Sequence, residues 1–187
     1  MGIRRILTFP APSLRGTARP VENITGETAQ WIEDLAQTMY AAPGIGLAAP
    51  QVGLDQRIIV LDVGPDEEEP GKERGKHLLH IVNPVIAESE GETIFEEGCL
   101  SVVDFRAEVK RAARVLVKGY DVDQHEIAIE ADGLLAVALQ HEIDHLEGTL
   151  FIDRLSRLKR DMYVKRVRKA LRDGRPITRD RDASERT

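Results

Sequence analysis

The chain contains a single cysteine and no long apolar segment. One cysteine, Cys99, excludes a disulfide bond within the chain. No apolar run approaches the roughly 20 residues that a membrane-spanning helix needs. The basic N-terminus, residues 1–7, lacks the apolar region and the cleavage site of a signal peptide, and Ile6 breaks the pattern for N-terminal myristoylation. From these absences we predict a cytoplasmic protein that does not bind membranes.

The composition is typical of a globular protein, but the charge is unevenly distributed. With 187 residues, 42% of them hydrophobic and 31% charged, the chain can bury one substantial core. We therefore predict a single domain over residues 1–174, followed by a polar tail over 175–187. Residues 153–187 carry 13 Lys and Arg against 6 Asp and Glu, whereas residues 1–152 carry 13 against 26. A basic end on an acidic body indicates a separate electrostatic task for the C-terminus.

The segment from Gln140 to His145 contains the pattern His-Glu-x-x-His inside an apolar helical run. Two imidazoles four residues apart, those of His141 and His145, lie on one face of a helix and can bind one metal ion. Glu142, beside the first histidine, can then take a proton from a water molecule that the metal activates. The motif therefore predicts a metal-dependent hydrolytic site on a helix.

Hydrophobic periodicity predicts an α+β fold around this helix. The motif helix should begin at Asp132 or Gly133 and end near Gly148, and another helix is predicted over 25–40. Strands or strand-like runs are predicted at 58–63, 78–86, 92–101, 109–120 and 126–130. The other predicted segments are a small-residue loop at 44–51, an exposed loop at 64–77 and a last helix at about 156–172. We find no internal repeat and no regular βαβ alternation, so we expect antiparallel or mixed sheets around a central metal-binding helix, with a C-terminal helix.

The third metal ligand cannot be a histidine that follows the motif. A catalytic site of this kind has three protein ligands and one open position, but no histidine lies after His145, and Phe151 occupies the third histidine position of a related protease pattern. An acidic ligand could come from Asp153 or Asp161. A thiolate from Cys99 would also suit a borderline divalent metal.

Three segments resemble the motifs of the peptide deformylase family, in the same order along the chain. They are Gly44-Ile45-Gly46-Leu47-Ala48-Ala49-Pro50-Gln51, Glu97-Gly98-Cys99-Leu100-Ser101 and Gln140-His141-Glu142-Ile143-Asp144-His145. The opening residues 6–15 are similar to the N-terminal strand and turn of that family, so the resemblance covers about residues 3–160. One departure lies in the middle motif, where the family usually has Cys-Leu-Ser-Ile/Val-Pro and this chain continues from Val102 to Val103 and Asp104.

The resemblance implies an enzyme that removes the N-formyl group from the initiator methionine of nascent chains and releases formate. The metal ligands that it implies are Cys99, His141 and His145. Glu142 would act as the general base and later deliver the proton to the leaving amine. The side-chain amide of Gln51 and the backbone N–H of Leu100 would face the oxyanion of the tetrahedral intermediate. The family resemblance also implies Fe²⁺ in the cell, with Zn²⁺, Ni²⁺ or Co²⁺ as alternatives in purified protein.

The resemblance also points to a substrate cleft. Its implied lining residues are Ile45, Gly46, Phe95, Glu97, Gly98, Arg106, Leu134 and Val137. An extended N-formylmethionyl peptide could pair as an added strand with exposed edges near Gly46 and Gly98, and Arg106 would stand on the rim. Apolar residues on one helix face are equally typical of a plain core. Two other functions share the motif: a metallopeptidase that cuts internal peptide bonds, and a metal-stabilised ribosome- or RNA-binding factor without enzymatic activity.

Ten Lys and Arg residues lie between Arg154 and Arg175. One interpretation is a solvated helix whose cations stabilise its C-terminal end. The other, which the family resemblance suggests, is docking on ribosomal RNA near the exit of the nascent peptide. Few aromatic residues lie in this segment, so phosphate contacts would dominate over base stacking. No feature of the sequence predicts DNA binding.

Overall fold

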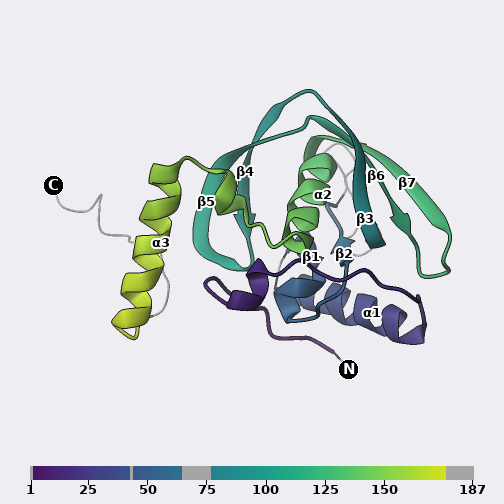
Figure 1. The fold of residues 1–187 in the computed structure, drawn as a ribbon, viewed down its shortest axis with the longest axis horizontal. Coiled ribbons are helices and arrows are strands. Elements are labelled where there is room, and N and C mark those ends of the chain that lie inside the picture. Colours follow the sequence, from purple (N-terminus) through teal and green to yellow (C-terminus); the bar gives the residue numbers. More distant parts are fainter. Residues whose placement is uncertain (1, 43, 65–76, 176–187) are drawn as a thin grey trace.

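The computed structural model describes residues 2–42, 44–64 and 77–175 as two antiparallel sheets with a helix between them (Figure 1). The larger sheet has the strand order β1-β2-β3-β6-β7, with β1 (Gly46–Ala48), β2 (Ile58–Leu61), β3 (Leu79–Glu90), β6 (Arg114–Tyr120) and β7 (Glu126–Asp132). The smaller sheet pairs β4 (Thr93–Cys99) with β5 (Val102–Arg111). All neighbouring strands in the described residues are antiparallel. The predicted α+β class is confirmed, and the two sheets are antiparallel rather than mixed.

The central helix is α2 (Gly133–Leu146), which carries the His-Glu-x-x-His motif. Gly133 opens it with a φ of 53°, a left-handed conformation that favours glycine. Every residue from Ala136 to Leu146 is buried, as expected for a helix whose apolar residues extend around most of its circumference. Polar side chains in this helix must therefore find partners inside the protein, and those partners define the site.

Helix α1 (Gly26–Ala41) closes one side of the larger sheet. Thr25 and Thr28 form a reciprocal capping box at its start. Its apolar face buries Ile32, Leu35 and Met39 against β1 and β2. This packing fixes the segment that follows the helix, which leads directly into the site.

The small-residue segment at 44–51, predicted as a loop, contains β1 and the 3₁₀ turn Ala49–Val52. The prediction was wrong here because Leu47, Ala48 and Ala49 are fully buried and β1 pairs with β2. The N-terminal segment has the expected turn at Pro12–Arg15 but no strand before it among the described residues. Apart from residues 64, 77 and 175, the predicted loop at 64–77 and tail at 175–187 lie outside the described residues.

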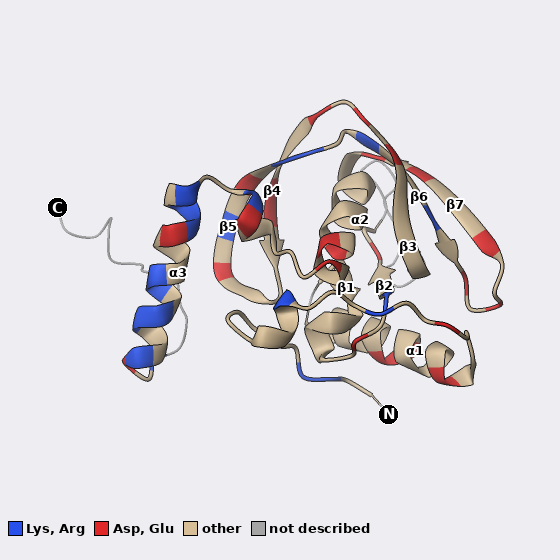
Figure 2. Cartoon of the chain, viewed as in Figure 1, with Lys and Arg blue, Asp and Glu red and all other residues tan. Residues whose placement is uncertain are grey.

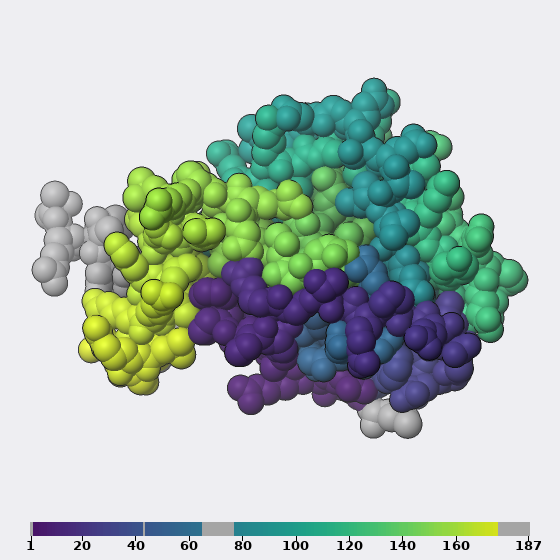
Figure 3. All heavy atoms as spheres, in the orientation of Figure 1, coloured from purple at the N-terminus to yellow at the C-terminus, as the bar shows by residue number. Residues whose placement is uncertain are grey.

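The predicted C-terminal helix is α3 (Arg157–Arg172), which lies beside the main body rather than in its centre (Figure 1). Ser156 caps its start, and only Tyr163 and Val167 are buried. Figure 2 shows Lys and Arg gathered along α3, in contrast to the acidic residues of the body. Figure 3 shows the N-terminal segment against α3, where the rings of Phe9 and Tyr163 lie 5.9 Å apart. Within the described ranges, no helix is both long and apolar enough to cross a membrane.

Candidate metal centre and substrate cleft

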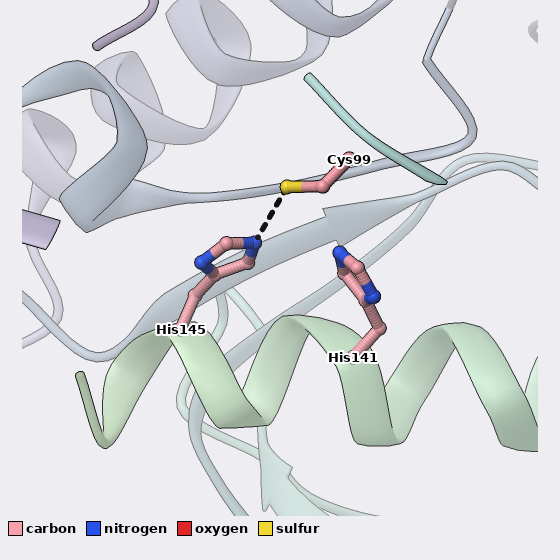
Figure 4. A group of neighbouring side chains, drawn as sticks. All are labelled: Cys99, His141 and His145. Carbon is pink, nitrogen blue, oxygen red and sulfur yellow. Dashed lines mark hydrogen bonds between the residues drawn. The ribbon is translucent and has the colours of Figure 1, made fainter. Parts of the chain in front are cut away.

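Cys99, His141 and His145 meet between the smaller sheet and α2 (Figure 4). One ligand atom from each residue lies within 4.8 Å of the other two, and Cys99 Sγ is 3.2 Å from His145 Nε2. Cys99 stands at the end of β4, and both imidazoles project from α2 toward it. The other predicted ligands are engaged elsewhere, because Asp153 pairs with Arg15 and Asp161 lies 3.6 Å from Arg157.

The imidazole of His141 is held in place by Glu97. The Nδ1 atom of His141 lies 2.7 Å from Glu97 Oε2, which leaves Nε2 to face the cysteine and a metal ion. Glu97 is also bound by Arg111, whose Nε and Nη2 atoms donate to its two oxygens at 2.7 and 2.9 Å. Burial alone would raise the pKa of Glu97, but the hydrogen bonds from Arg111 and His141 lower it to about 2. Glu97 was predicted as a substrate-binding residue, and its carboxylate lies behind the histidine rather than pointing into open space.

Arg111 links Glu97 to a second buried carboxylate, that of Asp144 on α2. Arg111 Nη1 donates to Asp144 Oδ2 at 2.5 Å, and Arg154 donates to the same carboxylate from the other side at 2.5 and 2.6 Å. Two buried carboxylates thus share the buried guanidinium group of Arg111, and Asp144 also binds the partly exposed Arg154. Removing one partner of such a buried pair typically costs about 3–5 kcal/mol. Sequence reasoning missed this network, although Asp144 gave a signal as an acidic residue inside an apolar helix.

The surroundings of His141 and His145 shift the pKa values of the two imidazoles in opposite directions. Burial by itself lowers the pKa of His141, but hydrogen bonds with Cys99 and Glu97 hold that pKa well above its ordinary value. Burial and the neighbouring charge of His141 hold the pKa of His145 well below its ordinary value. One thiolate and two imidazoles form a ligand set that fits Zn²⁺ or Fe²⁺.

Glu142 is buried beside the candidate ligands and borders the cleft. It is 5% exposed, and within the described part of the chain its Oε2 atom has no hydrogen-bond partner. Burial raises its pKa to about 7, close to the pH at which proton transfer in both directions is efficient. Gly46 makes room for this carboxylate, because a Cβ atom at Gly46 would lie 2.9 Å from Glu142 Cδ.

Gln51 presents its amide nitrogen to the same region. Its Oε1 atom accepts from Ala48 N–H at 2.8 Å, which fixes the orientation of the amide. Its Nε2 atom donates to Ser101 Oγ at 3.0 Å and lies 3.6 Å from Cys99 Sγ. Leu100 follows the cysteine and also lines the cleft. Both predicted oxyanion donors therefore stand next to the candidate metal site.

A cleft of about 580 Å³ opens beside the three ligands. All eight predicted substrate residues line it: Ile45, Gly46, Phe95, Glu97, Gly98, Arg106, Leu134 and Val137. Ile45 and Leu134 are 40% and 42% exposed, so these two apolar side chains are accessible from the cleft. Gly98 brings Arg106 close, because a Cβ atom there would lie 3.3 Å from Arg106 Cγ. Asp104, part of the departure from the family's middle motif, belongs to the same lining, and sequence reasoning missed Phe105 beside it.

Comparison with known proteins places this architecture among close relatives. A family model described as polypeptide deformylase matches residues 3–161. A peptide deformylase from Syntrophobacter fumaroxidans is 50% identical over 173 residues, which cover 92% of this chain and 98% of that protein. One from Rhizobium meliloti is 48% identical and covers 91% of this chain and 95% of its own. The crystal structure of a peptide deformylase from Legionella pneumophila superposes with a TM-score of 0.81 at 44% identity, covering 94% of this chain and 100% of that one.

Proposed function

Because the chain belongs to the peptide deformylase family, we propose how its residues divide the work of the family reaction. The protein is a metal-dependent hydrolase that removes the N-formyl group from the N-terminal methionine of newly synthesised proteins and releases formate. Family membership selects this function over the internal peptidase and the RNA-binding factor. The observation that carries the residue assignments is the meeting of Cys99, His141 and His145 beside the buried carboxylate of Glu142.

Cys99, His141 and His145 are the proposed ligands of one divalent metal ion. When bound there, the ion supplies a Lewis acid that lowers the pKa of water and polarises the formyl carbonyl group. Glu142 takes a proton from the attacking water, whose oxygen forms a bond to the formyl carbon. The carbon–nitrogen bond then breaks, and Glu142 returns the proton to the amine, which leaves as the free N-terminus of the peptide. The other product is formate.

Gln51 and Leu100 are the proposed donors to the oxyanion that forms on the formyl oxygen. The fixed orientation of the Gln51 amide supports this role, because Ala48 N–H holds its oxygen and its nitrogen faces Ser101 and Cys99. The backbone N–H of Leu100 follows Cys99 directly and lies at the end of β4. Removing one donor of this kind typically lowers the rate by roughly 10²–10³.

The cleft is the proposed binding site of the formylmethionyl peptide. Its apolar lining of Ile45, Phe95, Leu134 and Val137 suits the methionine side chain. The edge strand β1 and strand β4 flank this lining. An extended peptide backbone could therefore pair with the two strands, while Arg106 stands on the rim.

Fe²⁺ is the proposed metal in the cell, and residues 1–174 are proposed to form one cytoplasmic catalytic domain. Zn²⁺, Ni²⁺ and Co²⁺ suit the same ligands, and zinc binds such sites more tightly than iron. The sulfur of Cys99 is half-buried, so oxidation of this atom in air would destroy an iron site first. Metal content and formate release, measured together on protein purified without oxygen and then exposed to air, test this assignment. Full activity retained with zinc alone, before and after exposure, would contradict it.

The residue assignments are tested by formate release from formyl-Met-Ala-Ser. We expect formate from this peptide and no cleavage of longer unformylated peptides. Glu142→Ala should abolish release while the metal content stays at the wild-type level, because Glu142 is not a ligand. A variant that retained turnover would rule out Glu142 as the base.

The exposed cations of α3 are proposed to contact ribosomal RNA. Truncation before α3 would also remove the buried Tyr163 and Val167, so substitution is the cleaner test. Replacement of Lys165, Arg168 and Lys169 by Gln removes three exposed charges and leaves the buried face intact. We expect weaker cosedimentation with ribosomes at low salt and unchanged formate release from peptides. Undiminished cosedimentation of the triple variant would refute the contact.

A further inference from the structure

The beginning of β5, just after the turn from β4, bends and forms one wall of the cleft. Gly98 pairs with Arg106, but the next residue, Cys99, pairs with Val102, so residues 103–105 have no opposite partners on β4. Within this bulge Asp104 has a φ of 51°, in the left-handed region that a residue with a side chain rarely adopts. Asp104, Phe105 and Arg106 all line the cleft. The shape of this wall therefore depends on a strained backbone that something must hold.

Arg166 of α3 reaches across to hold this bulge. Its Nη2 atom donates to the backbone carbonyl of Asp104 at 3.0 Å and to that of Val103 at 3.5 Å. Both carbonyls lie in the bulge, and the guanidinium group binds them from α3 rather than from the partner strand. The guanidinium carbon also lies over the rings of Tyr163 and Phe105, at 5.1 and 5.8 Å from their centroids. The guanidinium group of Arg166 is thus held by two backbone carbonyls and by cation–π contacts with two rings.

An aromatic stack joins the same bend to the body of the protein. The rings of Phe105 and Tyr163 are stacked with centroids 4.7 Å apart, and Phe105 also stacks on Phe151 at 6.0 Å. Tyr163 is only 2% exposed, so α3 is anchored at this point. The wall of the substrate cleft is therefore among the places where this largely exposed, basic helix is attached to the body.

We propose that Arg166 is a positioning residue for peptide binding, through which α3 holds the 103–105 bend in the shape that receives the chain after the methionine. The residues that it holds stand on the rim and not at the ligands, so its loss should weaken binding of the peptide more than it slows the reaction. The effect should grow with peptide length, because only residues after the methionine reach the rim. This inference rests on the proposed role of the cleft in binding the peptide.

The test compares Arg166→Met with Arg166→Lys, using formyl-methionine and formyl-Met-Ala-Ser as substrates. Methionine keeps an apolar stem over the two rings but cannot donate, whereas lysine can still donate to one carbonyl. For Arg166→Met we expect the KM of the tripeptide to rise about tenfold, the size expected for one charge-assisted hydrogen bond, with kcat nearly unchanged. Arg166→Lys should fall between this variant and the wild type, and the KM of formyl-methionine should not change.

Arg114→Met is the matched control, because it makes the same substitution at an exposed position of β6 outside the cleft lining. It should leave both kinetic constants unchanged. The proposal is overturned if the tripeptide KM is unchanged in Arg166→Met, or if kcat falls for both substrates instead. If Arg166→Met does not fold, Arg166→Lys is the test. A raised tripeptide KM in that variant supports the proposal, and an unchanged KM overturns it. Absence of formate release by the wild type would instead refute the proposed function itself.

Discussion

The charges packed around α2 and those along α3 lie in opposite environments. The buried set around α2 consists of Glu97, Arg111 and Asp144, which are joined by hydrogen bonds, together with the buried carboxylate of Glu142. Most of the cations of α3 are exposed, and Arg166 is the member with several close contacts to the body. Buried charges act through geometry at short range, whereas exposed charges act at long range and are screened by salt. We therefore expect substitutions in the buried set around α2 and substitutions on α3 to differ in the size of their effects and in the salt dependence of those effects.

The largest effect should come from Glu142→Gln in the buried set. Glutamine keeps the shape of the side chain but cannot accept a proton from water. General base catalysis is typically worth about 10²–10⁴ in rate, so kcat should fall by roughly that factor. Formate release measures the rate, and metal analysis of the same sample shows whether the site is still loaded. A fall in metal content in proportion to the rate would mean that Glu142 supports the ligands rather than the proton transfer.

The next effect should be on folding, when Arg111 is removed. Arg111→Met leaves two carboxylates, those of Glu97 and Asp144, in a space where the Arg111 side chain is only 1% exposed. We expect the free energy of unfolding to fall by about 3–5 kcal/mol, measured by urea denaturation. Arg154→Met is the control. It removes the other partner of Asp144, and the Arg154 side chain is 42% exposed. Equal losses in the two variants would contradict the role assigned to burial.

A smaller effect should appear in acid, through Glu97. Burial by itself would raise the pKa of this carboxyl, but its partners lower it from an ordinary value of 4.5 to about 2. A carboxyl whose pKa is lower in the folded state stabilises the fold at pH values above its pKa in the unfolded state. This stability is lost as the pH falls through the pKa of the folded state. We expect a loss of about 3 kcal/mol between pH 4.5 and 2.

Urea denaturation of metal-free protein across this pH range measures the loss without a contribution from metal release. Glu97→Gln should flatten the dependence on pH. Glu108→Gln, on an exposed part of β5, should leave it as in the wild type. If the Glu97 variant kept the full acid dependence, the stabilising carboxylate would have to be another one.

The metal-binding motif could be predicted from sequence because its chemistry depends on local spacing. His141, Glu142 and His145 lie within one helical turn and a half, so the period of the helix alone places them together. The position of Cys99 could not be derived from helical spacing, since it comes from β4; thiolate chemistry made it a candidate, and the family resemblance selected it over Asp153 and Asp161. Arg111 was missed because nothing local distinguishes a buried arginine from a surface one.

The small-residue segment at 44–51 shows a different difficulty. Glycine and alanine are depleted in strands, so their pattern gave no sign that Gly46–Ala48 would pair with β2. Burial between α1, α2 and β2 imposes the strand, so tertiary contacts override local preference. The same segment holds Gly46, whose missing side chain leaves space for Glu142. A residue that weakens the local signal for a strand is thus the one that the site requires.

The smallest effect on stability should come from the exposed cations of α3. Replacing Lys165, Arg168 and Lys169 by Gln removes three charges that make no ion pair within the described residues. Each such surface substitution is usually worth less than about 0.5 kcal/mol, so unfolding should be almost unchanged. Binding to ribosomes should weaken, and its dependence on salt should become less steep, because fewer counterions are released from phosphates. Cosedimentation at several salt concentrations measures that slope, and an unchanged slope would show that these cations are merely solvated.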